Sequence, residues 1–104
     1  RIVLIDGLEL DLSPFPLPFA LLQIVAERAD AWVPLDDVVI RLYPEDITNR
    51  GNIRELVKVE RRLRQLMGRI HKMCRAVGVE QPVMMMRGGQ NEPGFQLLTT
   101  AKVV

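Results

Sequence analysis

Cysteine, aromatic residues and long apolar runs are scarce in this chain of 104 residues. Its one cysteine, Cys74, cannot form an internal disulfide, so a disulfide-stapled secreted fold is excluded and a cytoplasmic location is expected. The longest stretch without a charged residue lies between Asp11 and Glu27, contains three prolines, and is shorter than the roughly 20 residues of a bilayer span. No membrane segment is therefore predicted.

The composition is that of one ordinary globular domain. Seven glycines, seven prolines and 48% hydrophobic residues exclude a collagen-like or disordered chain, and the length leaves room for a single modest core. We therefore expect residues 1–104 to form one domain. The chain opens on Arg1, directly before an apolar run and without an initiator methionine or a signal-peptide pattern, which indicates a domain from a longer protein.

The charges are unevenly distributed along the chain. The 14 Lys and Arg nearly balance the 13 Asp and Glu, for a net charge of +1. Residues 50–75, however, hold nine of the basic residues and only two of the acidic ones, a net charge of +7, which leaves −6 on the rest. An acidic body with one strongly basic element is typical of a module that offers one face to a polyanion.

The beginning of the chain is predicted to be a β hairpin. Residues 2–5 are apolar, Asp6-Gly7 is a strong signal for a two-residue turn, and leucines alternate with acidic residues over 8–12. Because alternate residues of a strand point to opposite sides, one face of this hairpin is expected to be buried.

The end of the chain is predicted to be a second hairpin. Residues 83–86 and 95–99 have the composition of strands, and they flank a loop at 87–94 that is dense in turn formers. The three consecutive methionines at 84–86 belong to the first of these strands. The outer two are expected in the core and the middle one outside, rather than in a soft-metal site.

Three helices are predicted between the two hairpins. The first covers residues 18–28, because Pro16 and Pro18 lack backbone donors and are expected to hold the preceding segment extended. The second covers residues 35–43, where apolar residues recur at helical spacing, and Pro44 ends it.

A third, basic helix begins near Asn52, which with Glu55 resembles a capping box, and ends by Gly78 or already at Gly68. It has two opposite faces. The apolar face consists of Leu56, Val59, Leu63, Leu66, Met67 and Ile70. The polar face consists of Arg54, Lys58, Arg61, Gln65, Arg69 and Lys72. Most of these cations have no acidic partner one turn away, so a phosphate backbone would relieve their mutual repulsion.

The order of these elements, and four local motifs, resemble the C-terminal effector domain of OmpR/PhoB-type response regulators over nearly the whole chain. The motifs are Leu12-Ser13-Pro14 before Phe19-Ala20-Leu21-Leu22; Val33-Pro34-Leu35-Asp36-Asp37-Val38 before Leu42-Tyr43-Pro44; Arg62-Leu63-Arg64; and Arg87-Gly88-Gly89 before Gly94-Phe95-Gln96-Leu97. The resemblance implies an α+β winged helix-turn-helix fold, with a three-helix core, an N-terminal β hairpin and a C-terminal hairpin as the wing.

The resemblance also implies sequence-specific binding of double-stranded DNA in a bacterial transcription regulator, with the third helix in the major groove. Base edges would then be reached by Arg54, Lys58 and Arg61. The DNA-binding residues of this helix would also include Gln65. The phosphate contacts would come from Arg50, Arg62, Arg69 and Lys72. The wing would enter the minor groove through Arg87 and either Gln90 or Asn91. Family members contact RNA polymerase through the loop between the second and third helices, here residues 44–51. Whether two copies bind DNA as a dimer is left open.

An alternative keeps the fold but assigns it to protein interaction or dimerisation without DNA binding. Glu60 lies within the basic helix, and residues 90–93 look like an insertion in the wing, and both features favour this alternative. An enzyme is not expected, because no histidine or nucleophile accompanies the carboxylate pairs Asp36-Asp37 and Glu45-Asp46. No cofactor is expected either.

Two further pairs of residues are interpreted structurally. His71 and Cys74 are spaced as a pair of metal ligands would be, but two ligands do not complete a zinc site and the chain has no other Cys or His. Trp32 and Tyr43 are predicted to be core residues, since they are too far apart to form a platform for base stacking.

Overall fold

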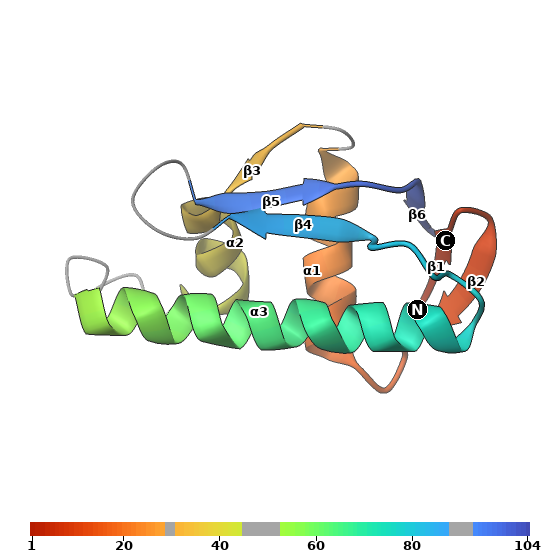
Figure 1. The fold of residues 1–104 in the computed structure, drawn as a ribbon, viewed down its shortest axis with the longest axis horizontal. Coiled ribbons are helices and arrows are strands. Elements are labelled where there is room, and N and C mark those ends of the chain that lie inside the picture. Colours follow the sequence, from red (N-terminus) through yellow and green to blue (C-terminus); the bar gives the residue numbers. More distant parts are fainter. Residues whose placement is uncertain (29–30, 45–52, 88–92) are drawn as a thin grey trace.

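The computed structural model describes residues 1–28, 31–44, 53–87 and 93–104, with the side chains of 53–56 excepted. Within these residues the chain forms three helices and two three-stranded antiparallel sheets (Figure 1). The predicted α+β class is confirmed at this level. The longest helix runs along the long axis of the molecule, the second sheet lies alongside it, and the first helix crosses behind it (Figure 1).

The first sheet joins the two ends of the chain. Strands β1 (Ile2–Ile5) and β2 (Leu8–Asp11) form the predicted hairpin, and the turn between them has positive φ at both central residues, 50° at Asp6 and 84° at Gly7. Such a turn matches the right-handed twist of the flanking strands. Strand β6 (Ala101–Val103) pairs with the other edge of β1 and was not predicted.

Helix α1 spans Pro16–Glu27, so the prediction that it starts near Pro18 was wrong by half a turn. The first four N–H groups of a helix have no partner inside the helix. Pro16 at the first position and Pro18 two residues later therefore cost no hydrogen bond. The helix buries apolar residues around most of its circumference, among them Phe19, Leu21, Leu22, Ile24 and Val25.

Helix α2 (Leu35–Leu42) begins where predicted and ends one residue earlier, with two acidic residues in its first turn, where the helix dipole favours them. It follows directly on β3 (Val33–Pro34), a two-residue strand that the sequence did not indicate. Strand β3 pairs with β5 (Gly94–Leu97), which also pairs with β4 (Met84–Arg87).

Helix α3 spans Ile53–Ala76, a length of 24 residues, and Gly68 does not interrupt it. It ends in a Schellman motif around Gly78, whose φ is +104°. Gly78 donates its N–H to the carbonyl oxygen of Arg75 at 3.1 Å, and Val79 donates to that of Cys74 at 2.9 Å. The predicted stop at Gly78 is therefore confirmed.

The core lies between α3, α1 and the inner faces of the sheets. Val59, Leu63, Leu66 and Ile70 of α3 are buried, as the predicted apolar face requires. The methionines of β4 behave as expected, with Met84 buried, Met85 exposed and Met86 half-buried. The first hairpin buries Val3, Ile5 and Leu10, whereas Leu8 is 41% exposed, because it begins the edge strand beside the turn.

Candidate functional site

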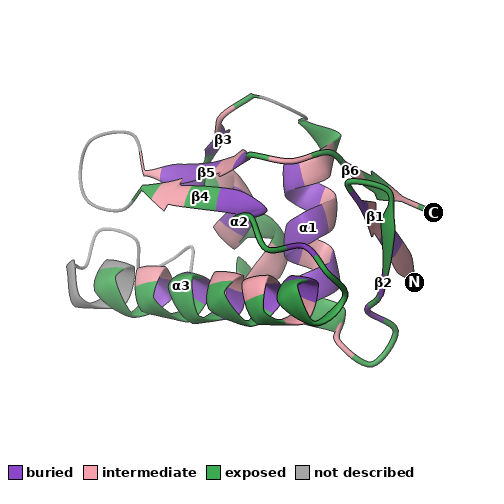
Figure 2. Cartoon of the chain, turned by 45° about the vertical axis from the view of Figure 1, so that its right-hand side comes forward, coloured by how far each residue is buried: buried purple, intermediate pink, exposed green. Residues whose placement is uncertain are grey.

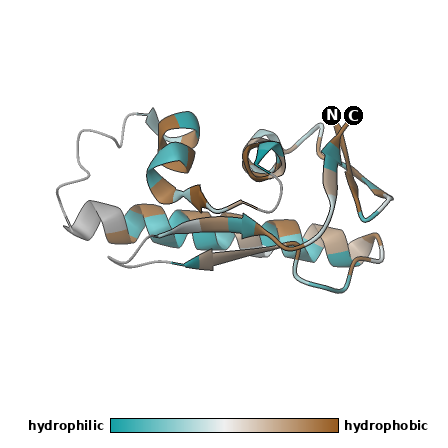
Figure 3. Cartoon of the chain, turned by 90° about the horizontal axis from the view of Figure 1, so that it is seen from above, coloured by the Kyte–Doolittle hydropathy of each residue, from teal (hydrophilic) through white to brown (hydrophobic). Residues whose placement is uncertain are grey.

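Helix α3 presents a cationic face along its uncovered side. Its buried residues recur at helical spacing, so the residues between them point away from the rest of the molecule. Figure 2 shows exposed residues along the helix, interrupted by buried ones, and Figure 3 shows hydrophilic and hydrophobic residues alternating along it. Eight polar residues of this helix have exposed side chains: Lys58, Arg61, Arg62, Arg64, Gln65, Arg69, Lys72 and Arg75. We call these eight the cationic face.

Six of the predicted site residues belong to this face: Lys58, Arg61, Arg62, Gln65, Arg69 and Lys72. Arg54 lies on the same helix, but its side chain is outside the described residues. Arg50 and Gln90 are also outside them, as is nearly all of the segment 44–51 expected to contact RNA polymerase. Arg87 is exposed on β4.

The cations of the face differ in their contacts from those on α1 and α2. Arg28 pairs with Asp37 at 2.8 Å, and Arg41 pairs with Glu27 at 2.6 Å. The hydrogen bond from Arg41 lowers the pKa of the Glu27 carboxyl. Within the part of the chain that the structure describes, neither Arg61 nor Lys72 has such a partner. The charges of α1 and α2 are neutralised locally, whereas much of the charge on α3 faces solvent.

Arg62 lies at the flank of the cationic face that is nearest to α1 and α2. Its guanidinium carbon is 5.5 Å from the centre of the Tyr43 ring, within cation–π range. Together with Arg69 it lines a depression of about 180 Å³, to which Leu17 of α1 contributes. Tyr43 is only half-buried, so the prediction that it is a core residue was wrong: it packs on one side and holds an arginine on the other.

Arg87 has a corresponding aromatic partner on the second sheet. Its guanidinium carbon is 5.2 Å from the centre of the Trp32 ring. Trp32 is also half-buried, which corrects its assignment to the core. No local sequence pattern indicates either arginine–aromatic pair, because the partners are far apart along the chain and meet only through packing of the helices and pairing of β3, β5 and β4.

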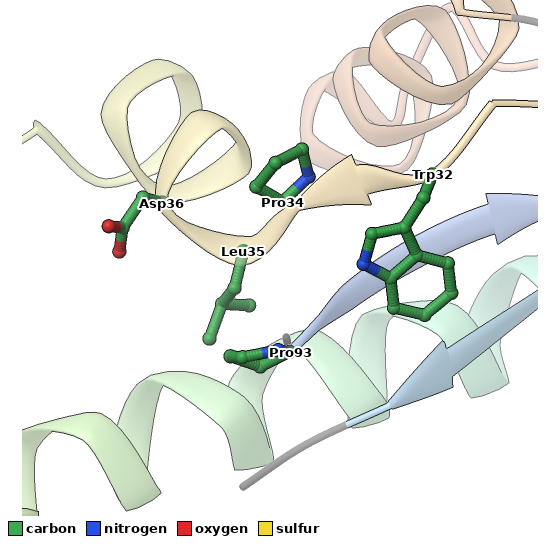
Figure 4. A pocket seen from close by; sticks show the side chains of 5 residues that line it. All are labelled: Trp32, Pro34, Leu35, Asp36 and Pro93. Atoms are coloured by element: carbon green, nitrogen blue, oxygen red, sulfur yellow. The ribbon is translucent and has the colours of Figure 1, made fainter. Parts of the chain in front are cut away.

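A pocket of about 370 Å³ lies near this pair, beside β3 (Figure 4). Trp32, Pro34, Leu35, Asp36 and Pro93 line it. In Figure 4 the Trp32 indole and the two proline rings surround the hollow, with the Asp36 carboxylate at its far side. Its walls are mainly apolar, and the residues of the cationic face are not among those that line it.

His71 and Cys74 are packed within the fold. The backbone N–H of Met84 donates to Nε2 of His71 at 3.4 Å, and burial, with the nearby charge of Arg75, lowers the pKa of this histidine. Burial raises the pKa of the Cys74 thiol to about 11. Among the described residues no group of three or more His, Cys, Asp and Glu side chains could hold a metal ion.

Comparison with known proteins gives no relative for this chain: no family model matches it, and no curated protein or solved structure does. A search of the described helices found none that is both long and apolar enough to cross a bilayer. The function of this chain is therefore inferred from the geometry and charge described above.

Proposed function

We propose that this chain is a winged helix-turn-helix domain that binds double-stranded DNA, as the effector domain of a bacterial transcription regulator. The observation that carries the proposal is the cationic face of α3. It is exposed along one side of the helix, while the apolar side of the same helix is buried in the core. In this proposal α3 lies in the major groove, and the hairpin of β4 and β5 is the wing.

The dimensions of the helix suit this role. At 1.5 Å per residue, the 24 residues of α3 extend over about 36 Å. The major groove is about 12 Å wide and admits one α-helix. A helix of this length extends beyond the groove, so its cations meet both base edges and the phosphates of the flanking backbones.

Position around the helix divides these cations into two groups. Arg61 lies in the middle of the exposed side, opposite the buried Val59 and Leu63, and is assigned to base edges together with Lys58. Arg62 and Arg69 border the depression beside α1 and α2, so they are assigned to phosphates at the wall of the groove.

The proposal is tested by fluorescence anisotropy of a labelled duplex of mixed sequence, titrated with the protein at several salt concentrations. If four to seven phosphates are contacted, log K should fall against log salt with a slope of roughly −4 to −6. Replacing Arg69 and Lys72, both assigned to phosphates, together by Gln should weaken binding and flatten this slope by about two. Lys102→Gln is the matched control, because Lys102 is an exposed cation on β6, in the other sheet.

A response that is absent at all salt concentrations would overturn the DNA proposal. The alternative would then take its place, with the cationic face as a docking surface for an acidic protein. Val57, which is 48% exposed on α3, would add apolar contact area at one border of that surface.

A further inference from the structure

A row of residues crosses the outer face of the second sheet. Pro34 of β3 lies opposite Gly94 of β5, and Gly94 lies opposite Arg87 of β4. Successive residues of an extended segment point to opposite faces of a sheet, and Val33 is fully buried. Its neighbours on either side, Trp32 and Pro34, therefore both point outward. Trp32 and Arg87 therefore belong to the same face of the sheet, on opposite sides of β5.

Gly94 leaves the space through which Trp32 approaches this row. A Cβ atom at Gly94 would lie 2.9 Å from the indole Nε1 of Trp32 and 3.1 Å from its Cε2, and it would also collide with the carbonyl oxygen of Val33. Any other residue at this position would push the indole away from the sheet. The glycine thus allows the ring to lie against the middle strand and to reach the guanidinium of Arg87.

The contact with Trp32 leaves the hydrogen-bonding capacity of Arg87 available. A cation–π contact uses the positive charge of a guanidinium and consumes none of its five N–H donors. The side chain of Arg87 is exposed, and among the described residues no acidic side chain pairs with it, so these donors are accessible to an anion. A long side chain held in this way loses less conformational freedom when it binds an anion.

From this arrangement we infer that Trp32 is a positioning residue, which orients Arg87 for contact with the phosphates or the minor groove of DNA. The inference rests on the proposed function and adds to it a residue outside the cationic face. Trp32 acts through Arg87 and itself makes no contact with the nucleic acid. Its effect on binding should therefore disappear when Arg87 is absent.

Trp32 is the single tryptophan of the chain, so fluorescence excited selectively at tryptophan, without Tyr43, reports on this site alone. In the free protein, Arg87→Ala should change the emission of Trp32, and Lys102→Ala should not. Addition of unlabelled duplex should change the emission of the wild-type protein and have a much smaller effect on Arg87→Ala. Equal emission of wild type and Arg87→Ala in the free protein would overturn the contact itself.

A double-mutant cycle tests the coupling, with Trp32→Leu, Arg87→Ala and the double variant titrated against the same labelled duplex. Trp32→Leu should weaken binding by about 3- to 10-fold in the presence of Arg87, as expected for loss of a partly exposed cation–π contact, and by less than 2-fold in the Arg87→Ala background. Trp32→Phe, which keeps an aromatic face, should restore most of the affinity. Thermal denaturation of each variant shows that the fold is retained.

The two proposals fail in different ways. If the wild-type protein binds no duplex at low salt, the proposed function is overturned and this inference falls with it. If the wild type binds but Trp32→Leu weakens binding equally with and without Arg87, only the positioning role is overturned. The same conclusion follows if Trp32→Phe fails to restore affinity while remaining as stable as the wild type.

Discussion

The carboxylate of Asp6 accepts two hydrogen bonds from Thr100, one from its backbone N–H at 3.0 Å and one from its hydroxyl at 2.9 Å. The backbone N–H of Asp6 in turn donates to the carbonyl oxygen of Thr100 at 3.0 Å. These three bonds fasten the turn of the first hairpin to the segment that enters β6. Residues 94 positions apart thereby form one local structure.

Asp6→Ala should lower the free energy of unfolding by about 1 to 2 kcal/mol, because it removes two hydrogen bonds to a carboxylate and places alanine at positive φ. Urea denaturation followed by circular dichroism measures this. Asp6→Asn should lose less, since asparagine tolerates the left-handed conformation and keeps one acceptor. An equal loss for both variants would contradict the assignment.

Replacement of Gly68 and replacement of Gly94 by alanine should change the free energy of unfolding in opposite directions. A Cβ at Gly68 would meet no atom within 4 Å, and the position is inside a helix, so Gly68→Ala should raise the free energy of unfolding by about 1 kcal/mol. Gly94→Ala should lower it, because the new methyl group collides with Val33 and Trp32. Melting temperatures of the two variants, compared with that of the wild type, show whether each substitution stabilises or destabilises the fold.

The thiol of Cys74 should be unreactive in the folded protein. The side chain is fully buried and its pKa is raised from 9.0 to about 11, so little thiolate is present or accessible at pH 8. A thiol reagent should label it only after addition of guanidinium chloride. Because the folded pKa lies above the unfolded value, the associated stability is complete below pH 9 and is lost as the pH rises toward 11.

His71 should make the fold less stable in mild acid. Its pKa in the folded state is lowered from 6.5, mainly by burial, so the neutral imidazole is favoured there. The corresponding stability is present above pH 6.5 and is lost as the pH falls through the folded pKa. Free energies of unfolding measured at pH 7 and pH 5 should differ more for wild type than for His71→Gln, which cannot titrate. Equal differences would exclude His71 as the cause.

The local patterns in the sequence predicted the elements whose stabilising features lie close together in the chain. The hairpin at Asp6-Gly7, helix α2 and the two faces of α3 each follow from spacing within a few residues, and the structure agrees with them. Strands β3 and β6 have two and three residues, and each is a strand only because a distant partner pairs with it. No local pattern marks such a strand.

In the candidate site, too, the sequence predicted the local features and missed the tertiary contacts. The exposure of Arg61, Gln65 and Lys72 follows from helical periodicity. The contacts of Arg62 with Tyr43 and of Arg87 with Trp32 depend on tertiary packing, and the sequence suggested only that both aromatic residues were buried. Burial on one side and a cation on the other satisfies the apolar and polar parts of these amphipathic rings at once.

Strand β1 lies in the middle of its sheet, between β2 and β6. During synthesis it can pair at once with β2, but its other edge has no neighbour until residues 101–103 have left the ribosome. Until then the nascent chain carries an open strand edge next to Val3 and Ile5, which are fully buried in the folded domain. Closing this edge pairs Val3 with Val103, a highly non-local contact whose loop-closure entropy slows folding.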